Sequence, residues 1–137
     1  LISVMPIFNL YNSDWPIHTQ QVNLPPAKFI HDSEGNQGRT NDSIVSLGTV
    51  VTGGIVERSV LSPNVRVHSR ALVTDSVLMD NVVVGRDATV RRAILDKDVH
   101  IADGASVGVS RERDIARGFV VTDSGITVVA KGIHVNP

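Results

Sequence analysis

Branched aliphatic residues recur along the middle of the chain with a fixed period of 17 residues. Four rows of that length, beginning at residues 44, 61, 78 and 95, align without a gap. Within each row the aliphatic positions follow one another after six, six and five residues. They form three columns: Ile44, Leu61, Leu78 and Leu95; Val50, Val67, Val84 and Ile101; Val56, Val73, Val90 and Val107.

A period near six, with one large and one small inward residue, predicts a parallel β-helix over residues 44–111. Each unit forms a short strand and a corner, three units form one triangular coil, and coils stack about 4.8 Å apart. An amphipathic helix would instead repeat its apolar residues at three and four. The small residues stand two positions before the aliphatic ones: Gly54, Ala71, Ala88 and Ala105; Ser59, Ser76 and Ala93; and, less strictly, Gly48, Val65, Val82 and Val99.

Local signals predict the flanking segments. We expect the end of a helix stopped near Pro6 and a flexible loop over residues 33–42. After the repeat we expect a helical turn over residues 112–117. The remaining predictions are an extended connector over residues 11–26, a strand over 27–31, and a β-hairpin cap over 119–130 with its turn at Thr122–Gly125.

The alternation of side chains along a strand predicts an apolar stripe on the outer surface. The residues just before the first column, Val60, Val77 and Ile94, must face outward and stack on successive coils. We expect this stripe to be covered by the segment around Trp15 and Phe29, by another domain or by another subunit. The alternative is that these are ordinary scattered surface residues.

Composition excludes several classes of site. The formal net charge of −1 gives no general attraction to nucleic acid or to anionic membranes. The absence of cysteine excludes disulfides, thiolate nucleophiles and Cys-ligated zinc. Of five histidines, His68 or His100 would be the general base of a hexapeptide acyltransferase. A zinc site with three histidines is not expected, because His68 and His100 occupy different columns and no third residue follows the spacing. The other three histidines are His18, His31 and His134.

Five segments resemble the C-terminal domain of ADP-glucose pyrophosphorylase (glucose-1-phosphate adenylyltransferase). They are PPAKF at 25–29, DSIVSLGTVVTGG at 42–54, SVL at 59–61, VGRDATVRRAILDK at 84–97 and GITVVAKG at 125–132. The resemblance implies a left-handed β-helix at 44–111, a connector from an N-terminal catalytic domain at 1–43, and a C-terminal cap at 112–137. It also implies a cytoplasmic homotetramer that makes ADP-glucose and pyrophosphate from ATP and glucose 1-phosphate for glycogen or starch synthesis.

The same resemblance assigns the catalytic residues and Mg²⁺ to a domain outside this chain. No glycine-rich nucleotide loop of the family type occurs here, so we expect no catalytic residue and no cofactor in this chain. A start at Leu1 rather than methionine fits a piece of a longer protein, or the loss of a few residues. The alternative function is a stand-alone hexapeptide acyltransferase or binding module, which would be a trimer.

Two lysines, Lys97 and Lys131, match basic residues that contact an anionic effector in the family; otherwise they are ordinary surface lysines. Some relatives carry an arginine four residues after the second of these, where this chain has Val135. Arg91 and Arg92 follow Val90 and form either a solvated corner or a phosphate-facing or interface pair. The arginines of residues 111–117, interleaved with Glu112 and Asp114, are interpreted as solvated.

Overall fold

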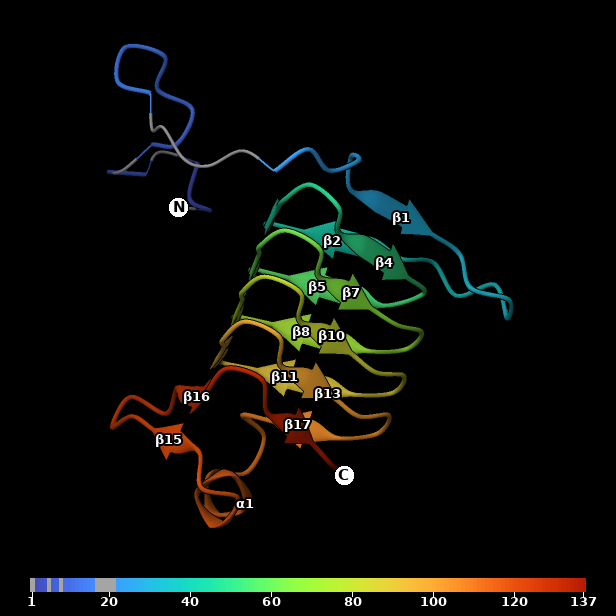
Figure 1. The fold of residues 1–137 in the computed structure, drawn as a ribbon, viewed down its shortest axis with the longest axis vertical. Coiled ribbons are helices and arrows are strands. Elements are labelled where there is room, and N and C mark those ends of the chain that lie inside the picture. The colour runs from blue at the N-terminus through green and yellow to red at the C-terminus, as the bar shows by residue number, and fades with distance from the viewer. Residues whose placement is uncertain (1, 5, 8, 17–21) are drawn as a thin grey trace.

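Short parallel strands wind into a three-sided prism in the computed structural model, which describes residues 2–4, 6–7, 9–16 and 22–137 (Figure 1). The first sheet contains β1 (Lys28–Ile30), β4 (Val50–Thr52), β7 (Arg66–Val67), β10 (Val83–Val84), β13 (His100–Ile101) and β17 (His134–Val135). The second contains β2 (Arg39–Asn41), β5 (Ile55–Glu57), β8 (Leu72–Thr74), β11 (Thr89–Arg91) and β14 (Ser106–Val107). The third contains β3 (Ile44–Val45), β6 (Val60–Leu61), β9 (Val77–Leu78), β12 (Ala93–Leu95), β16 (Thr127–Val129) and β15 (Val120–Val121).

The predicted aliphatic columns fill the centre of the prism. Leu78 and Val84 are both 0% exposed, as predicted. Leu78 pairs with Leu61 on the coil before it and with Leu95 on the coil after it. The sheets are parallel except for the β15–β16 pair, so each inward residue packs on its equivalent in the next coil.

The predicted register is wrong by one residue in the first coil. Val45, not Ile44, pairs with Leu61, and Val51, not Val50, pairs with Val67. The corner between Val51 and Val56 is one residue shorter than the equivalent corners below it, and Gly53 turns it at φ +63°. Consequently Thr49, which is 0% exposed, takes the inward position predicted for Gly48.

A ladder of serine hydroxyl groups explains one of the small-residue columns. The Oγ of buried Ser76 donates to the Thr74 carbonyl at 2.7 Å and accepts the Ala93 backbone N–H at 3.1 Å. Ser59 does the same one coil earlier, donating to Glu57 and accepting from Ser76. These backbone N–H groups would otherwise be buried without a partner, which is costly.

The sheets extend before residue 44, and the predicted flexible loop is wrong in part. Arg39–Asn41 forms β2 and pairs in parallel with β5. The turn before it is ordered by Asp32, whose carboxylate accepts the Asn36 side-chain amide and the backbone N–H groups of Asn36 and Glu34. These bonds lower the pKa of Asp32 to about 2, and the bond from the Asn36 side chain contributes most.

Two further predictions on the N-terminal side have different outcomes. The strand over residues 27–31 is confirmed as β1. The expected helix end near Pro6 is wrong for the described residues of that stretch, which form only bends and a turn; residues 1, 5 and 8 lie outside the described residues.

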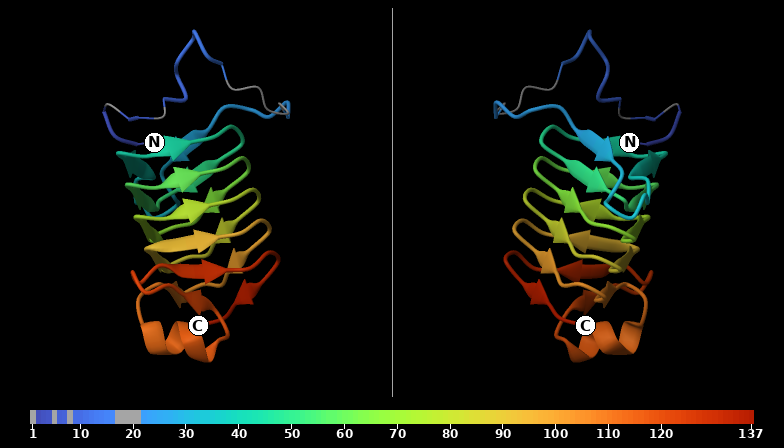
Figure 2. Two further views of the ribbon diagram at one scale, coloured as in Figure 1. Left: turned by 90° about the vertical axis from the view of Figure 1, so that its left-hand side faces the viewer. Right: turned by 90° about the vertical axis from the view of Figure 1, so that its right-hand side faces the viewer.

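The C-terminal end departs from the repeat as predicted. Residues Arg111–Ala116 form the helix α1, and β15 and β16 form the expected hairpin, with Gly125 at φ +79° in its turn. Strand β16 also pairs in parallel with β12, so the hairpin joins the third sheet (Figure 2). Helix α1 lies at the end of the prism opposite the N-terminal segment (Figure 2).

Candidate functional site

The structure places Lys97 and Lys131 at the same corner on adjacent coils. The Gly132 N–H donates to the Lys97 carbonyl at 2.9 Å, so the two lysines are equivalent positions of neighbouring coils. Both side chains are more than half exposed. Their equivalents on the earlier coils are Asp80, Pro63 and Leu47. An unbroken 17-residue spacing would place Ser46 at this corner of the first coil, but Leu47 lies there because the register of that coil is shifted by one residue.

Carboxylates lie beside both lysines. The Lys97 Nζ is 3.9 Å from Asp96, and the Lys131 Nζ is 3.7 Å from Asp98. Exposed pairs at such distances hold a side chain only weakly, so an incoming anion can compete for either lysine. Asp98 is oriented by the Asn81 side-chain amide, which donates to it at 2.9 Å.

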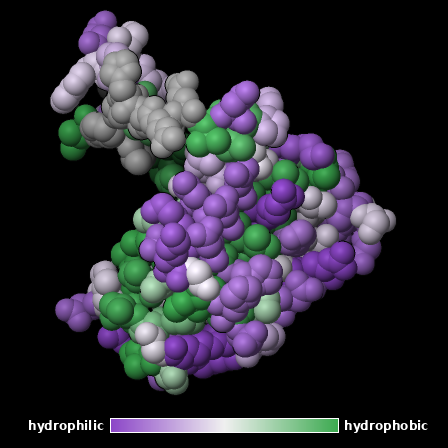
Figure 3. Space-filling model, viewed as in Figure 1, coloured by the Kyte–Doolittle hydropathy of each residue, from purple (hydrophilic) through white to green (hydrophobic). Residues whose placement is uncertain are grey.

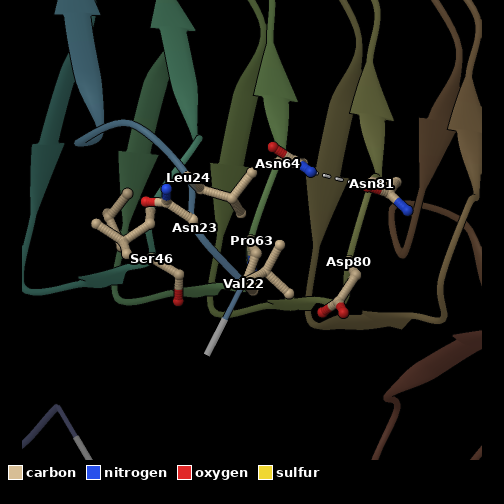
Figure 4. Close-up of a pocket in the computed structure, with 10 residues that line it drawn as sticks. Val22, Asn23, Leu24, Ser46, Pro63, Asn64, Asp80 and Asn81 are labelled. Atoms are coloured by element: carbon tan, nitrogen blue, oxygen red, sulfur yellow. Dashed lines mark hydrogen bonds between the residues drawn. The ribbon is translucent and has the colours of Figure 1, made fainter. Parts of the chain in front are cut away.

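An open groove of about 1080 Å³ occupies the N-terminal half of the same corner (Figure 4). Its wall is the connector at residues 22–24, held against the first coil by a bond of 2.7 Å from the Gly48 N–H to the Pro25 carbonyl. Its floor carries Leu47, Pro63 and Asp80. These residues occupy, on earlier coils, the corner position that Lys97 occupies on a later coil. The corner therefore changes from apolar and acidic to basic along the prism.

The second basic pair has a different place and a partly structural role. Arg92 lies at the corner between the second and third sheets, whereas the lysines lie between the third and first. The Arg92 guanidinium donates to the Ser124 carbonyl in the hairpin turn, and its own carbonyl accepts the Thr127 N–H. Arg91 is exposed on the outer face of β11. The structure therefore does not bring Arg91 and Arg92 together with the lysines.

The interpretation of the arginines of residues 111–117 as solvated agrees with the exposed Arg111 and Arg113 and is wrong in part for Arg117, which is half-buried. Asp114 is 1% exposed, and its Oδ2 accepts the Gly108 N–H and the Thr127 hydroxyl, both at 2.8 Å. Arg117 donates to the carbonyls of Ser106 and Asn136, and Arg111 to that of Thr122. Spacing alone gives no sign of these bonds, because each joins the helix to a different strand or turn.

Replacing Asp114 with alanine should lower the free energy of unfolding by about 2–4 kcal/mol, because it leaves two buried donors without an acceptor. Asp114→Asn is the matched control, since its side-chain oxygen still accepts both bonds and should preserve most of the stability. Urea unfolding followed by circular dichroism measures both variants. Equal stability of Asp114→Ala and the unaltered chain would contradict this role.

The apolar stripe faces outward on the third sheet. Val60, Val77 and Ile94 are paired in register, and Ile44 and Val128 extend the stripe at its two ends. The first three are half-buried in this chain. Apolar surface is visible on the side of the prism that carries the hairpin (Figure 3). Trp15 is 77% exposed and Phe29 belongs to the first sheet, so these two residues do not supply the cover.

The histidines that the structure describes do not form a metal centre. His68 and His100 occupy different outward columns of the first sheet, and His31 is exposed; His18 lies outside the described residues. Among the residues that the structure describes, no group of three or more His, Cys, Asp or Glu side chains is arranged to hold a metal ion. Within the same residues no helix is long and apolar enough to cross a membrane.

Comparison with known proteins gives one family and one set of relatives. Residues 25–129 match the family described as GlmU-like, C-terminal hexapeptide. The chain is also similar to proteins named glucose-1-phosphate adenylyltransferase. Identity is 58% for that of Leifsonia xyli subsp. xyli (100% of this chain, 33% of the relative) and 57% for that of Bifidobacterium adolescentis (99% and 33%). For Deinococcus radiodurans it is 50% (96% and 32%).

The chain thus spans about a third of the length of the relatives it matches. The family match begins just before β1 and ends with β16, so it covers most strands of all three sheets. Fold and sequence agree on a hexapeptide-repeat β-helix. The chain therefore belongs to the GlmU-like C-terminal hexapeptide family, with a left-handed parallel β-helix as its fold.

Proposed function

We propose that this chain is the regulatory and assembly domain of a glucose-1-phosphate adenylyltransferase. The observation that carries the proposal is that the whole chain is similar to about a third of the length of enzymes with that name. The full-length protein would make ADP-glucose and pyrophosphate from ATP and glucose 1-phosphate, for glycogen synthesis in the cytoplasm. The acyltransferase alternative is not favoured, because the relatives carry a different activity in their names.

The catalytic work belongs to another domain in this proposal. Binding of ATP and of Mg²⁺ needs a phosphate-binding loop and carboxylate ligands. Residues 1–43 would connect the β-helix to the domain that carries these groups. We keep the domain division expected from sequence as a proposal, with a connector at 1–43, a β-helix at 44–111 and a cap at 112–137; strands β1 and β2 at the end of the connector already pair with the β-helix. The partners are the catalytic domain and the other subunits of a homotetramer.

The effector site is the corner that carries Lys97 and Lys131. Two flexible ammonium groups on adjacent coils suit a phosphate or carboxylate ligand, because lysine binds an anion as a mobile point charge. The neighbouring carboxylates, Asp96 and Asp98, are exposed and bound loosely enough to be displaced. Arg91 and Arg92 lie at another corner, and we place them outside this site.

In the full-length protein, Lys97→Ala and Lys131→Ala should each weaken activation by the effector and leave the basal rate mostly unchanged. Allosteric coupling is typically about 1–3 kcal/mol, a shift of roughly 5–150-fold in the half-activating concentration. Arg86→Ala, an exposed arginine elsewhere on the prism, is the matched control. Activation curves that coincide with that of the unaltered protein in both lysine variants would reduce these residues to ordinary surface lysines.

A further inference from the structure

The same four-residue pattern occurs twice at this corner. Lys97 and His100 in the first copy and Lys131 and His134 in the second have the spacing Lys-x-x-His. The copies lie on adjacent coils, since His100 pairs with His134 and the Lys97 carbonyl accepts the Gly132 N–H. Two lysines and two histidines are therefore stacked where the corner meets the first sheet.

The two imidazole rings lie against each other on the outer face of the first sheet. Their centroids are 5.1 Å apart and their planes meet at 27°. His100 is half-buried and His134 is exposed, so both rings are open to a ligand from solvent.

No carboxylate faces the pair from the outward positions of β10, β13 and β17. The neighbours are Val83 on β10 and, directly after β13 and β17, Ala102 and Asn136. The charged groups at the adjoining corner are the two lysines and Asp98, and Arg117 donates to the Asn136 carbonyl at the end of the prism.

The charge of this corner depends on the histidines. The charges of Lys97 and Lys131 are offset by Asp96 and Asp98, and Asp80 occupies the same corner one coil before Lys97, so neutral rings leave this corner without an excess of positive charge. Histidine gains its proton between about pH 8 and 5, and two protonated rings add two positive charges to the corner.

We propose that His100 and His134 form part of the anion site at this corner, and that the pair binds a doubly charged phosphate group in its protonated form. The inference rests on the proposed function in taking the effector site to be Lys97 and Lys131, and it adds two contact residues and a pH dependence. By linkage, an anion that prefers the protonated rings must also make them easier to protonate. Binding of an anion that stays doubly charged therefore strengthens as the pH falls.

The imidazole titrations of this chain, followed by NMR with and without an added anion, test the inference. Inorganic phosphate is the first probe, and sulfate is the second because it stays doubly charged over the whole range. Both should move the titration midpoints of His100 and His134 to higher pH. His68 lies on the same face in another column, two coils away from His100, and its midpoint should not move. Sulfate should bind roughly tenfold more tightly at pH 6 than at pH 8.

His100→Gln and His134→Gln should each flatten that pH dependence, and His68→Gln should leave it intact. Titration midpoints of His100 and His134 that do not change with either anion would overturn the inference. Glutamine variants in which sulfate binding keeps its pH dependence would also overturn it. In that case weakened activation in the lysine variants of the full-length protein would still support the effector site. Conversely, anion-dependent midpoints together with unaltered activation in the lysine variants would support an anion site here and remove the proposed regulatory role.

Discussion

Replacing Leu78 with alanine should lower the free energy of unfolding of this chain by about 2–5 kcal/mol. The side chain is 0% exposed, and Leu61 and Leu95 lie directly above and below it. The cavity left by alanine cannot collapse easily, because hydrogen bonds between coils fix their separation. Both the lost burial and the unfilled space therefore contribute to the cost.

Val77→Ala is the matched control for this prediction. Val77 precedes Leu78 on β9 but points outward and is half-buried, so its replacement should cost about 1 kcal/mol or less. Urea unfolding of both variants, followed by circular dichroism, gives the comparison. Equal costs at the two positions would contradict the assignment of inward and outward faces.

Purified chain mixed with ATP, Mg²⁺ and glucose 1-phosphate should form no ADP-glucose. Transfer of a nucleotidyl group needs groups that bind the phosphates and the metal ion. The Gly53-Gly54 pair of this chain has a structural role instead: Gly53 turns a corner at φ +63°, and a Cβ on Gly54 would lie 2.8 Å from the His68 carbonyl oxygen.

Chromatographic detection of ADP-glucose measures that activity, with the full-length protein as the positive control. The same preparation can be tested for folding by its circular dichroism, so that inactivity is not confused with unfolding. Turnover that copurifies with the folded chain would contradict the assignment of catalysis to another domain.

The sequence was sufficient to predict the core because inward columns of aliphatic residues repeat at a fixed spacing. It failed in the first coil for an identifiable reason. Two aliphatic residues are adjacent at Ile44–Val45 and again at Val50–Val51, so the pattern fits either register. Only the shorter corner at Gly53 decides between them, and a pattern of hydrophobic residues does not detect a missing corner residue.

The candidate site could be predicted only in part. Lys97 and Lys131 are 34 residues apart, the length of two coils, yet they lie on adjacent coils. The reason is that α1 and β15 take up the length of a coil outside the repeat. The buried role of Asp114 depends on the same insertion, because its acceptor oxygen joins Gly108 to Thr127 across it. Neither relation leaves a periodic signal.

We expect the stripe of Val60, Val77 and Ile94 to be a docking surface of this chain in the full-length protein. An outward-facing stripe of half-buried, branched apolar residues favours association, and we infer that the catalytic domain or a second subunit covers it. The chain has no cysteine, so a single introduced thiol reports on one position. Thr89→Cys, outward on the second sheet, is the control for Val77→Cys.

The direct measurement is the rate of thiol labelling of Val77→Cys in this chain and in the full-length assembly, with the labelled residue identified by peptide mass. We expect fast labelling of Val77→Cys in the isolated chain and strong protection in the assembly, while Thr89→Cys is labelled fast in both. Equal labelling of Val77→Cys in the isolated chain and in the assembly would contradict it, because the stripe would then lie open to solvent in the intact protein.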